Sequence, residues 1–274
     1  MASSVLPSLM DVPLQEPPKP LFIPPLENGD RLTRAEFERR YEAMPHVRKA
    51  ELIDGEVYLP SPVRVKQHGV PNYDLLTFLG IYSHFTSGVC GAGNATVRLD
   101  MQNEPQPDGL LYIEPECGGN IRVDDDDIIS GAPELAAEIS ASSVSIDLGK
   151  KFQVYRRNKV QEYIVWRVLD RAIDWFSWNN GDYERLPATA DSVVKSLVFP
   201  GLWLDLAAII RHDFVRAHAV LQQGLQSPEH AAFVAALQAK RQKNKPTVRR
   251  PWACEIAGFI TSPASSSSSA PSSG

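Results

Sequence analysis

Short segments of strand and helix periodicity alternate along most of this chain, and this alternation limits the fold more than any other feature. Segments with the apolar, β-branched and aromatic pattern of strands are residues 95–101, 108–114, 133–140, 162–168 and 172–178. Residues 145–158 separate the third strand pattern from the fourth, and their apolar side chains recur at helical spacing. Strands that precede and follow helices in this order predict a single α/β or α+β domain.

The first part of the predicted domain contains two local signals that are strong on their own. Thr33 and Glu36 form a capping-box pattern at the start of a short amphipathic helix. The pair Asp54-Gly55 lies between two alternating segments and predicts a two-residue hairpin. Residues 72–85 are apolar at helical spacing and predict a buried helix.

Both ends of the chain have compositions that cannot bury much apolar surface. Residues 1–28 are proline-rich and residues 246–274 are low in complexity and rich in serine, so we expect both to be disordered. The predicted domain is residues 29–210, and residues 211–245 are expected to form a helical extension. We expect residues 204–242 to form a helical tail of two pieces, with Ser227 capping the second.

Composition excludes several classes of protein. The net charge of -5 argues against binding nucleic acid through bulk positive charge, so a phosphate would need a local patch or a metal. Three scattered cysteines indicate neither a disulfide framework nor a zinc site, and they fit the cytoplasm. No apolar run reaches the roughly 18 residues that span a bilayer, so no membrane association is expected.

Two acidic residues stand where neighbouring strands could bring them together. Asp108 begins one strand pattern, and Glu138 lies inside the next on the face opposite Leu135 and Ile139. Two carboxylates that meet would repel each other unless a cation lay between them, and hard divalent ions prefer carboxylate oxygens. The pattern therefore predicts a metal site.

The following helix could add a positive charge to that site. Asp147, Lys151 and Tyr155 are spaced four residues apart and share one helical face. An alternative stays open from the pattern alone. In that alternative Asp108 is a turn residue, Glu138 lies at a half-exposed edge, and Asp147 with Lys151 is an ion pair on the helix surface.

Five stretches in this order resemble the Uma-type restriction endonuclease family, a branch of the PD-(D/E)XK nuclease superfamily. The stretches are AELIDGEVYLPSP, QPDGLLYI, PELAAEISASS, DLGKKFQVYRRNKVQEYIVW and VFPGLWLD. The resemblance spans roughly residues 31–210. It implies a PD-(D/E)XK nuclease-like fold, in which a mixed central sheet is flanked by helices and followed here by the helical extension.

The resemblance also implies roles for individual residues. Asp108 and Glu138 match the two acids that bind a divalent metal. The superfamily lysine normally lies two residues after the second acid, where this chain has Ser140. Members of the family resemble a variant in which this lysine has moved to the next helix, and the matching residue here is Lys151. The adjacent Lys150 is expected to point to solvent.

Three further positions match the family pattern, and for each of them two different roles are possible. Glu51 resembles an additional early acid near the metal, although the hairpin at Asp54-Gly55 also explains its motif. His68 is expected to form a hydrogen bond at a helix start rather than to act in catalysis. Gln106 is expected either to contact substrate or to orient the metal site.

The resulting expectation is an endonuclease that hydrolyses phosphodiester bonds, in DNA, with Mg²⁺ or Mn²⁺. Asp108 and Glu138 would bind the metal, and Lys151 and Glu51 would complete the catalytic set. A homodimer is compatible with this expectation. The alternative is a catalytically inactive nuclease-fold protein that acts as a nucleic-acid-associated or structural module, with acids present but no lysine within their reach.

Overall fold

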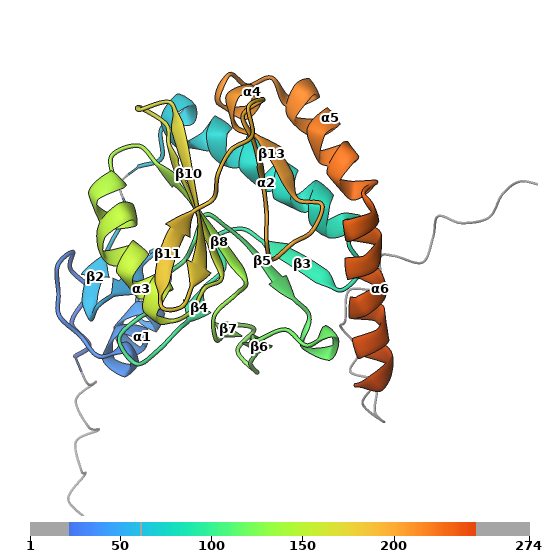
Figure 1. Cartoon of the computed structure of the whole chain (residues 1–274). Coiled ribbons are helices and arrows are strands. Elements are labelled where there is room, and N and C mark those ends of the chain that lie inside the picture. The colour runs from blue at the N-terminus through green and yellow to red at the C-terminus, as the bar shows by residue number, and fades with distance from the viewer. Residues whose placement is uncertain (1–21, 61, 245–274) are drawn as a thin grey trace, which may run out of the picture.

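The protein is described by a computed structural model that covers residues 22–60 and 62–244 (Figure 1). The helices are α1 (Arg34–Glu42), η1 (Val65–Gly69), α2 (Val70–His84), η2 (Pro115–Cys117), η3 (Ile146–Lys151), α3 (Phe152–Arg157), α4 (Leu206–Ile210), α5 (Phe214–Leu225) and α6 (Pro228–Lys243). The strands are β1 (Glu51–Ile53), β2 (Glu56–Tyr58), β3 (Val89–Ala92), β4 (Val97–Arg98), β5 (Gly109–Ile113), β6 (Arg122–Val123), β7 (Ile129–Ser130), β8 (Leu135–Ser140), β9 (Glu162–Arg167), β10 (Ala172–Asn179), β11 (Asp182–Arg185), β12 (Val193–Lys195) and β13 (Trp203–Asp205).

A six-stranded mixed sheet forms the centre of the molecule, in the order β11-β10-β9-β8-β5-β3. Strands β8 and β9 are parallel, and the other neighbours in the sheet are antiparallel. A parallel pair needs a long crossover, and η3 with α3 supplies it between β8 and β9. This mixed sheet flanked by helices confirms the α/β class predicted from the sequence.

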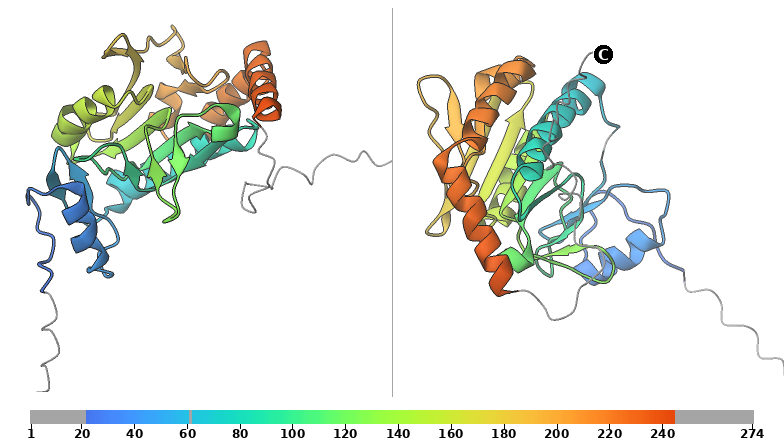
Figure 2. Two further views of the ribbon diagram at one scale, coloured as in Figure 1. Left: turned by 90° about the horizontal axis from the view of Figure 1, so that it is seen from below. Right: turned by 90° about the vertical axis from the view of Figure 1, so that its right-hand side faces the viewer.

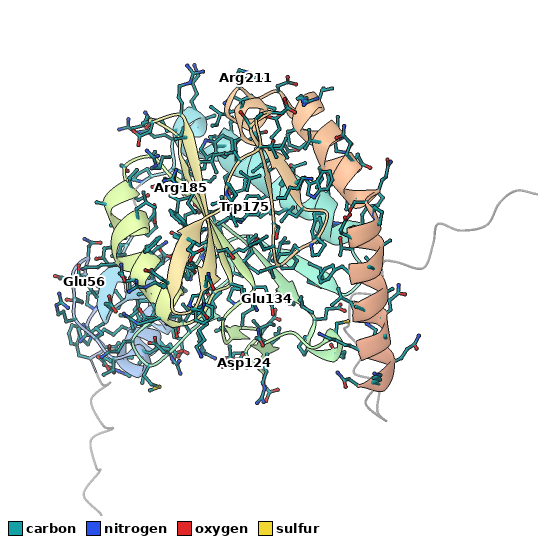
Figure 3. All side chains as sticks on the ribbon, viewed as in Figure 1. Glu56, Asp124, Glu134, Trp175, Arg185 and Arg211 are labelled. Carbon is teal, nitrogen blue, oxygen red and sulfur yellow. The ribbon has the colours of Figure 1, made fainter. Side chains whose placement is uncertain are left out.

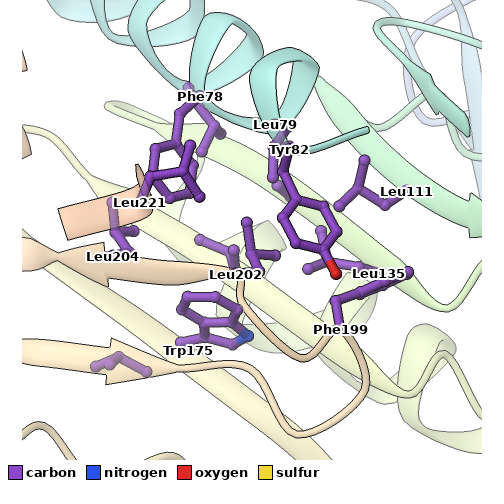
Figure 4. Close-up of a cluster of buried hydrophobic side chains, with 14 of the residues drawn as sticks. Phe78, Leu79, Tyr82, Leu111, Leu135, Trp175, Phe199, Leu202, Leu204 and Leu221 are labelled. Atoms are coloured by element: carbon purple, nitrogen blue, oxygen red, sulfur yellow. The ribbon is translucent and has the colours of Figure 1, made fainter. Parts of the chain in front are cut away.

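The larger hydrophobic core lies between one face of the sheet and helices α2 and α5 (Figure 4). Phe78 and Tyr82 of α2 pack there with Leu221 of α5, and the sheet contributes Leu135 and Trp175. Helices α2 and α5 also contact each other in this core. Because α5 takes part in the main core, the predicted extension packs against the domain.

A second core fills the other face of the sheet, beneath α3. Tyr155 of α3 packs there with Ala136 of β8 and with Tyr163 and Val165 of β9. All six residues of β8 are buried, because both of its faces are covered. Glu138 belongs to the Ala136 face, as the alternation in the sequence predicts.

The N-terminal lobe consists of α1 and the β1–β2 hairpin, at the end of the sheet opposite α6 (Figure 2). The Thr33 hydroxyl accepts a hydrogen bond from the Glu36 backbone N–H, so the predicted cap forms. Asp54 and Gly55 have φ values of 54° and 70°, the left-handed conformations that a type I′ hairpin requires. Leu26 is 3% exposed and packs in this lobe, so the packed chain starts before the predicted boundary at residue 29.

The C-terminal helices differ in one respect from the expectation of two pieces. The chain bends between α4 and α5, where His212 has a φ of 59°, and this divides the segment into three helices. Ser227 caps α6 by accepting a hydrogen bond from the His230 N–H, as predicted. No helix within the described part of the chain is long and apolar enough to cross a membrane. Residues 1–21 and 245–274 of the predicted tails lie outside the described residues.

Two helices are preceded by π-helical turns, one inside the predicted helix of residues 145–158 and one before the predicted helix of residues 72–85. Residues Val65–Gly69 precede α2, and residues Ile146–Lys151 precede α3. A π-turn is rare, and short stretches of it are frequent at functional sites. Both stretches carry side chains of the candidate site described below.

Candidate active site

Asp108 and Glu138 lie at the same end of two neighbouring strands. Asp108 directly precedes β5, and the antiparallel register pairs Gly109 with Ala137 of β8. The Ile139 N–H donates a 2.8 Å hydrogen bond to Asp108 Oδ2. The structure thus brings the two predicted acids together at the carboxyl end of β8.

Lys151 completes the cluster from the end of η3. Its Nζ lies 2.9 Å from Glu138 Oε1 and 2.9 Å from Glu51 Oε1. The Tyr155 hydroxyl donates to the same Glu138 oxygen at 3.0 Å. Four predicted site residues, Asp108, Glu138, Lys151 and Glu51, therefore converge from β1, β5, β8 and η3.

Ser140 occupies the position where the superfamily lysine would stand, and it supports the displaced lysine indirectly. Its hydroxyl donates to Asp147 Oδ2 at 2.7 Å, and the Ser143 hydroxyl donates to the same oxygen at 2.5 Å. Asp147 Oδ1 in turn lies 3.8 Å from Lys151 Nζ. The serine thus anchors the carboxylate that flanks the lysine.

The surface interpretation of these residues is wrong. Asp108, Glu138, Asp147 and Lys151 are all buried, each with no more than 4% of its surface exposed. The polar cluster lies under α3 and the N-terminal lobe, so a half-exposed edge for Glu138 and a surface ion pair for Lys151 do not describe it.

Two further side chains contact Asp108, and of these the family pattern points to His68 but not to Lys49. Lys49 Nζ lies 3.3 Å from Asp108 Oδ1, and His68 Nε2 lies 3.2 Å from Asp108 Oδ2. His68 lies in η1 at the start of the helix and forms a hydrogen bond, as predicted, and the partner of its ring is Asp108 in the cluster. Among the described residues, the buried His68 Nδ1 has no hydrogen-bond partner. Lys49 lies in irregular chain before β1, where no periodicity marks it.

Glu51 and Gln106 are linked through the backbone. The Gln106 N–H donates to Glu51 Oε1 at 2.7 Å. The Gln106 side chain instead donates to the Thr96 hydroxyl at 3.0 Å, and the whole residue is buried. This geometry fits the orienting interpretation of Gln106, which holds Glu51 toward Lys151.

Lys150 faces away from the acids, although it adjoins Lys151 in sequence. Its Nζ lies 3.0 Å from Glu56 Oε2 and 2.8 Å from the Tyr58 hydroxyl, both on β2. The side chain is 42% exposed, whereas that of Lys151 is 5% exposed. The two adjacent lysines therefore lie in different environments, although Lys150 is bound to β2 and is not free in solvent.

Burial and charge shift the pKa values of the cluster in opposite directions. Burial, together with the carboxylates of Asp108, Asp147 and Glu51, raises the pKa of Glu138 well above its usual range, although Lys151 opposes this. Burial would also raise the pKa of Asp108, but His68, Lys49 and the Ile139 N–H outweigh it and hold that pKa below its usual range. Titratable groups with strongly divergent environments are typical of functional sites.

The donor set fits a hard divalent cation. Four buried carboxylates, those of Glu51, Asp108, Glu138 and Asp147, face two ammonium groups in the described part of the chain, and a bound cation would offset the surplus negative charge. Mg²⁺ commonly takes one or two carboxylates and completes its shell with water and phosphate oxygens. Within residues 22–60 and 62–244, no three His, Cys, Asp or Glu side chains form a ready-made metal cage. If such an ion binds, Asp108 and Glu138 are the carboxylates placed to hold it, together with water and substrate.

Fold and site together describe a nuclease-like α/β protein of the PD-(D/E)XK type. Residues 34–207 match the sequence profile of the Uma2 family, whose description is "Putative restriction endonuclease", and the chain belongs to this family. The resemblance seen in the sequence is confirmed by this match.

Comparisons with solved structures and with curated proteins say less about the family of this chain than the sequence profile does. The fold is similar to that of a "putative nuclease belonging to DUF820" from Anabaena variabilis, with 13% sequence identity and a TM-score of 0.48. The match covers 63% of this chain and 97% of that chain. The comparison with curated proteins gives no match. The family assignment therefore rests on the sequence profile.

Proposed function

We propose that this protein is a metal-dependent endonuclease that hydrolyses phosphodiester bonds in DNA. The observation that carries the proposal is the buried Asp108–Glu138 pair with Lys151 Nζ 2.9 Å from Glu138. Membership of a family described as restriction endonucleases supports a nucleic-acid substrate. The inactive alternative predicts acids without a lysine in reach, and the Lys151 contact argues against it.

Asp108 and Glu138 would hold Mg²⁺ or Mn²⁺. When bound, such an ion polarises a phosphoryl oxygen and lowers the pKa of a bound water. In hydrolysis a water oxygen adds to the phosphorus, the bond to one ester oxygen breaks, and that oxygen leaves with a proton.

Lys151 is placed to act on the phosphate or on the attacking water. Burial would lower the pKa of Lys151, but the charges of Glu138, Glu51 and Asp147 raise it well above its usual range, so the ammonium stays charged. A fixed ammonium in a site with little water stabilises negative charge that develops on a phosphate. Tyr155 holds Glu138 by a hydrogen bond to Oε1, and burial raises the pKa of the Tyr155 hydroxyl so that it stays a donor.

Cleavage of supercoiled plasmid DNA tests the proposal. We expect nicking by the purified protein with Mg²⁺, none in chelator, and a loss of at least about 100-fold in the variants Asp108→Asn and Glu138→Asn. Asp170→Asn is the matched control, because Asp170 is a half-exposed carboxylate that forms an ion pair with Arg167 outside the cluster. Equal thermal midpoints would show that the variants are folded. Full activity in chelator, or equal cleavage by wild type and both site variants, would contradict the proposal.

A further inference from the structure

A pocket of about 460 Å³ lies at the carboxyl end of β9, and its lining combines apolar side chains with two arginines. Pro71, Trp166 and Ile210 supply apolar surface, and Trp166 is almost fully buried. Arg171 and Arg211 are exposed and lie at the rim. Figure 3 labels Arg211 at the end of the molecule where α4 lies, away from Asp124.

Within the described part of the chain, the two arginines at this pocket have no carboxylate partner. Among the described residues neither guanidinium of Arg171 or Arg211 forms an ion pair, whereas the nearby Arg167 and Arg216 are paired with Asp174 and Asp205. In a chain with a net charge of -5, two unpaired cations at one pocket create a local positive field.

The backbone around the pocket holds the rim in a defined conformation. Arg171 lies in a turn with a φ of 51°, and its N–H donates to the Val168 carbonyl. His212 follows Arg211 with a φ of 59°, and its Nδ1 lies 2.8 Å from Asp74 Oδ2 of α2. The ring–carboxylate contact ties the turn after α4 to the helix that follows η1.

Two short connections link this pocket to the candidate active site. Trp166 pairs in register with Ile139, whose N–H donates to Asp108. Pro71 lies three residues after His68, whose ring contacts Asp108, and three helical residues span about 5 Å. The pocket and the acids therefore lie at the same end of the parallel strands, near the start of α2, with the pocket on the α2 face of the sheet and Glu138 on the α3 face.

We propose that this pocket binds a backbone phosphate of the nucleic-acid strand, next to the phosphate that is cleaved, with Arg171 and Arg211 as its ligands. The guanidinium group is planar and always charged, and it donates two parallel hydrogen bonds to phosphate oxygens. Open α/β sheets bind ligands outside the carboxyl ends of their strands, where this pocket lies. The inference rests on the proposed function and adds a substrate-binding subsite to it.

A second pocket provides an internal comparison. It has a similar volume of about 470 Å³ and is lined by Lys159, Asn158 and Trp178 among others. Lys159 precedes β9, so this pocket lies at the amino end of the strand and away from the acids. Like Arg171, Lys159 is exposed and has a positive φ, of 63°. Lys159→Gln is therefore a matched control for Arg171→Gln.

The experiment measures binding of a fluorescein-labelled 20-base-pair DNA duplex by anisotropy, in chelator and across a series of NaCl concentrations. A lost phosphate contact lowers the slope of log K against log[NaCl] by about 0.9. We expect this change for Arg171→Gln and for Arg211→Gln, with affinity about tenfold lower at low salt. We expect Lys159→Gln to bind as wild type and Arg211→Lys to keep the salt slope. In Mg²⁺ the two arginine variants should raise KM and leave kcat unchanged.

The outcomes separate this inference from the proposed function, because binding is measured without turnover. Wild-type slopes in both arginine variants, or an equal loss in Lys159→Gln, would overturn the subsite. If the arginine variants weaken binding while the wild-type protein fails to cleave in Mg²⁺, the subsite is supported and the nuclease activity is contradicted. Absence of any DNA binding by wild type would overturn both.

Discussion

Lys151 is a charged side chain that is almost completely buried, and this is expensive unless other groups compensate. Moving an ammonium out of water costs several kcal/mol, and Glu138, Glu51 and Asp147 offset that cost. Replacing such buried ionic clusters with apolar residues is often neutral or stabilising, so stability alone does not explain them. A cluster of this kind at the end of a sheet is better explained by chemistry than by folding.

Glu104 is a buried carboxyl outside the candidate active site whose ionisation should weaken the fold. It is 3% exposed, and no hydrogen-bond donor among the described residues reaches its buried Oε2. Burial, together with the neighbouring Glu38 carboxylate, raises the pKa of Glu104 to about 8. The folded protein therefore holds a proton that the unfolded chain releases at a pKa of about 4.3.

The sign of the pH dependence follows from this difference. Stability from the protonated Glu104 is fully present below about pH 4 and is lost as pH rises toward 8. We expect wild type to lose about 3–4 kcal/mol more stability than Glu104→Gln between pH 5 and pH 8, measured by urea unfolding. Glu116→Gln, which changes an exposed carboxyl, should follow wild type. The same pH profile in Glu104→Gln and wild type would contradict the assignment.

At the scale of elements, the short segment before α1 is part of the N-terminal lobe. Leu26 packs with Phe37, Leu52 and Val57, although its segment has no regular secondary structure. We expect Leu26→Ala to lower the free energy of unfolding by about 2–3 kcal/mol, because it removes a buried side chain. Phe22→Ala should change it by less than about 0.5 kcal/mol, since Phe22 is 82% exposed. Similar small effects of both substitutions, in urea unfolding, would show that the segment does not stabilise the lobe.

The elements that the sequence predicts best are those whose pattern is local. The alternation of β8 placed Glu138 opposite Leu135, and the Asp54-Gly55 pair determined the hairpin, because both depend on nearest neighbours along the chain. The π-turns at η1 and η3 could not be predicted, because no residue type distinguishes them from α-helix. The bend between α4 and α5 depends on a left-handed His212, which the periodicity of the segment does not reveal.

At the scale of the whole molecule, strand and helix spacing predicts the part of the site that comes from consecutive elements, and Glu51 and His68 are identified only through the family resemblance. Glu138 and Lys151 are 13 residues apart and lie on a strand and the helix that follows it. Lys49 and His68 reach Asp108 across 59 and 40 residues of sequence. Their positions depend on how the N-terminal lobe and η1 pack against the sheet, and no local pattern encodes that packing.

The same packing places the candidate active site where three parts of the molecule meet. Lys49 and Glu51 come from the N-terminal lobe, the acids from the sheet, and Lys151 from the crossover between β8 and β9. The pocket of Arg171 and Arg211 lies at the same end of the strands. In the proposed function, one end of the molecule would therefore carry both the chemistry and the binding of the substrate backbone.

Comparing the two adjacent lysines tests the central claim, that this cluster is the active site, most directly. The measurement is single-turnover cleavage of one DNA substrate by Lys151→Ala and Lys150→Ala, with magnesium affinity determined by calorimetry. We predict that Lys151→Ala lowers cleavage at least about 100-fold and still binds magnesium, which would show that the acids remain in place. Lys150→Ala should cleave almost as wild type, because its ammonium binds Glu56 and Tyr58 on β2. Loss of cleavage in Lys150→Ala alone, or no loss in either variant, would contradict the claim.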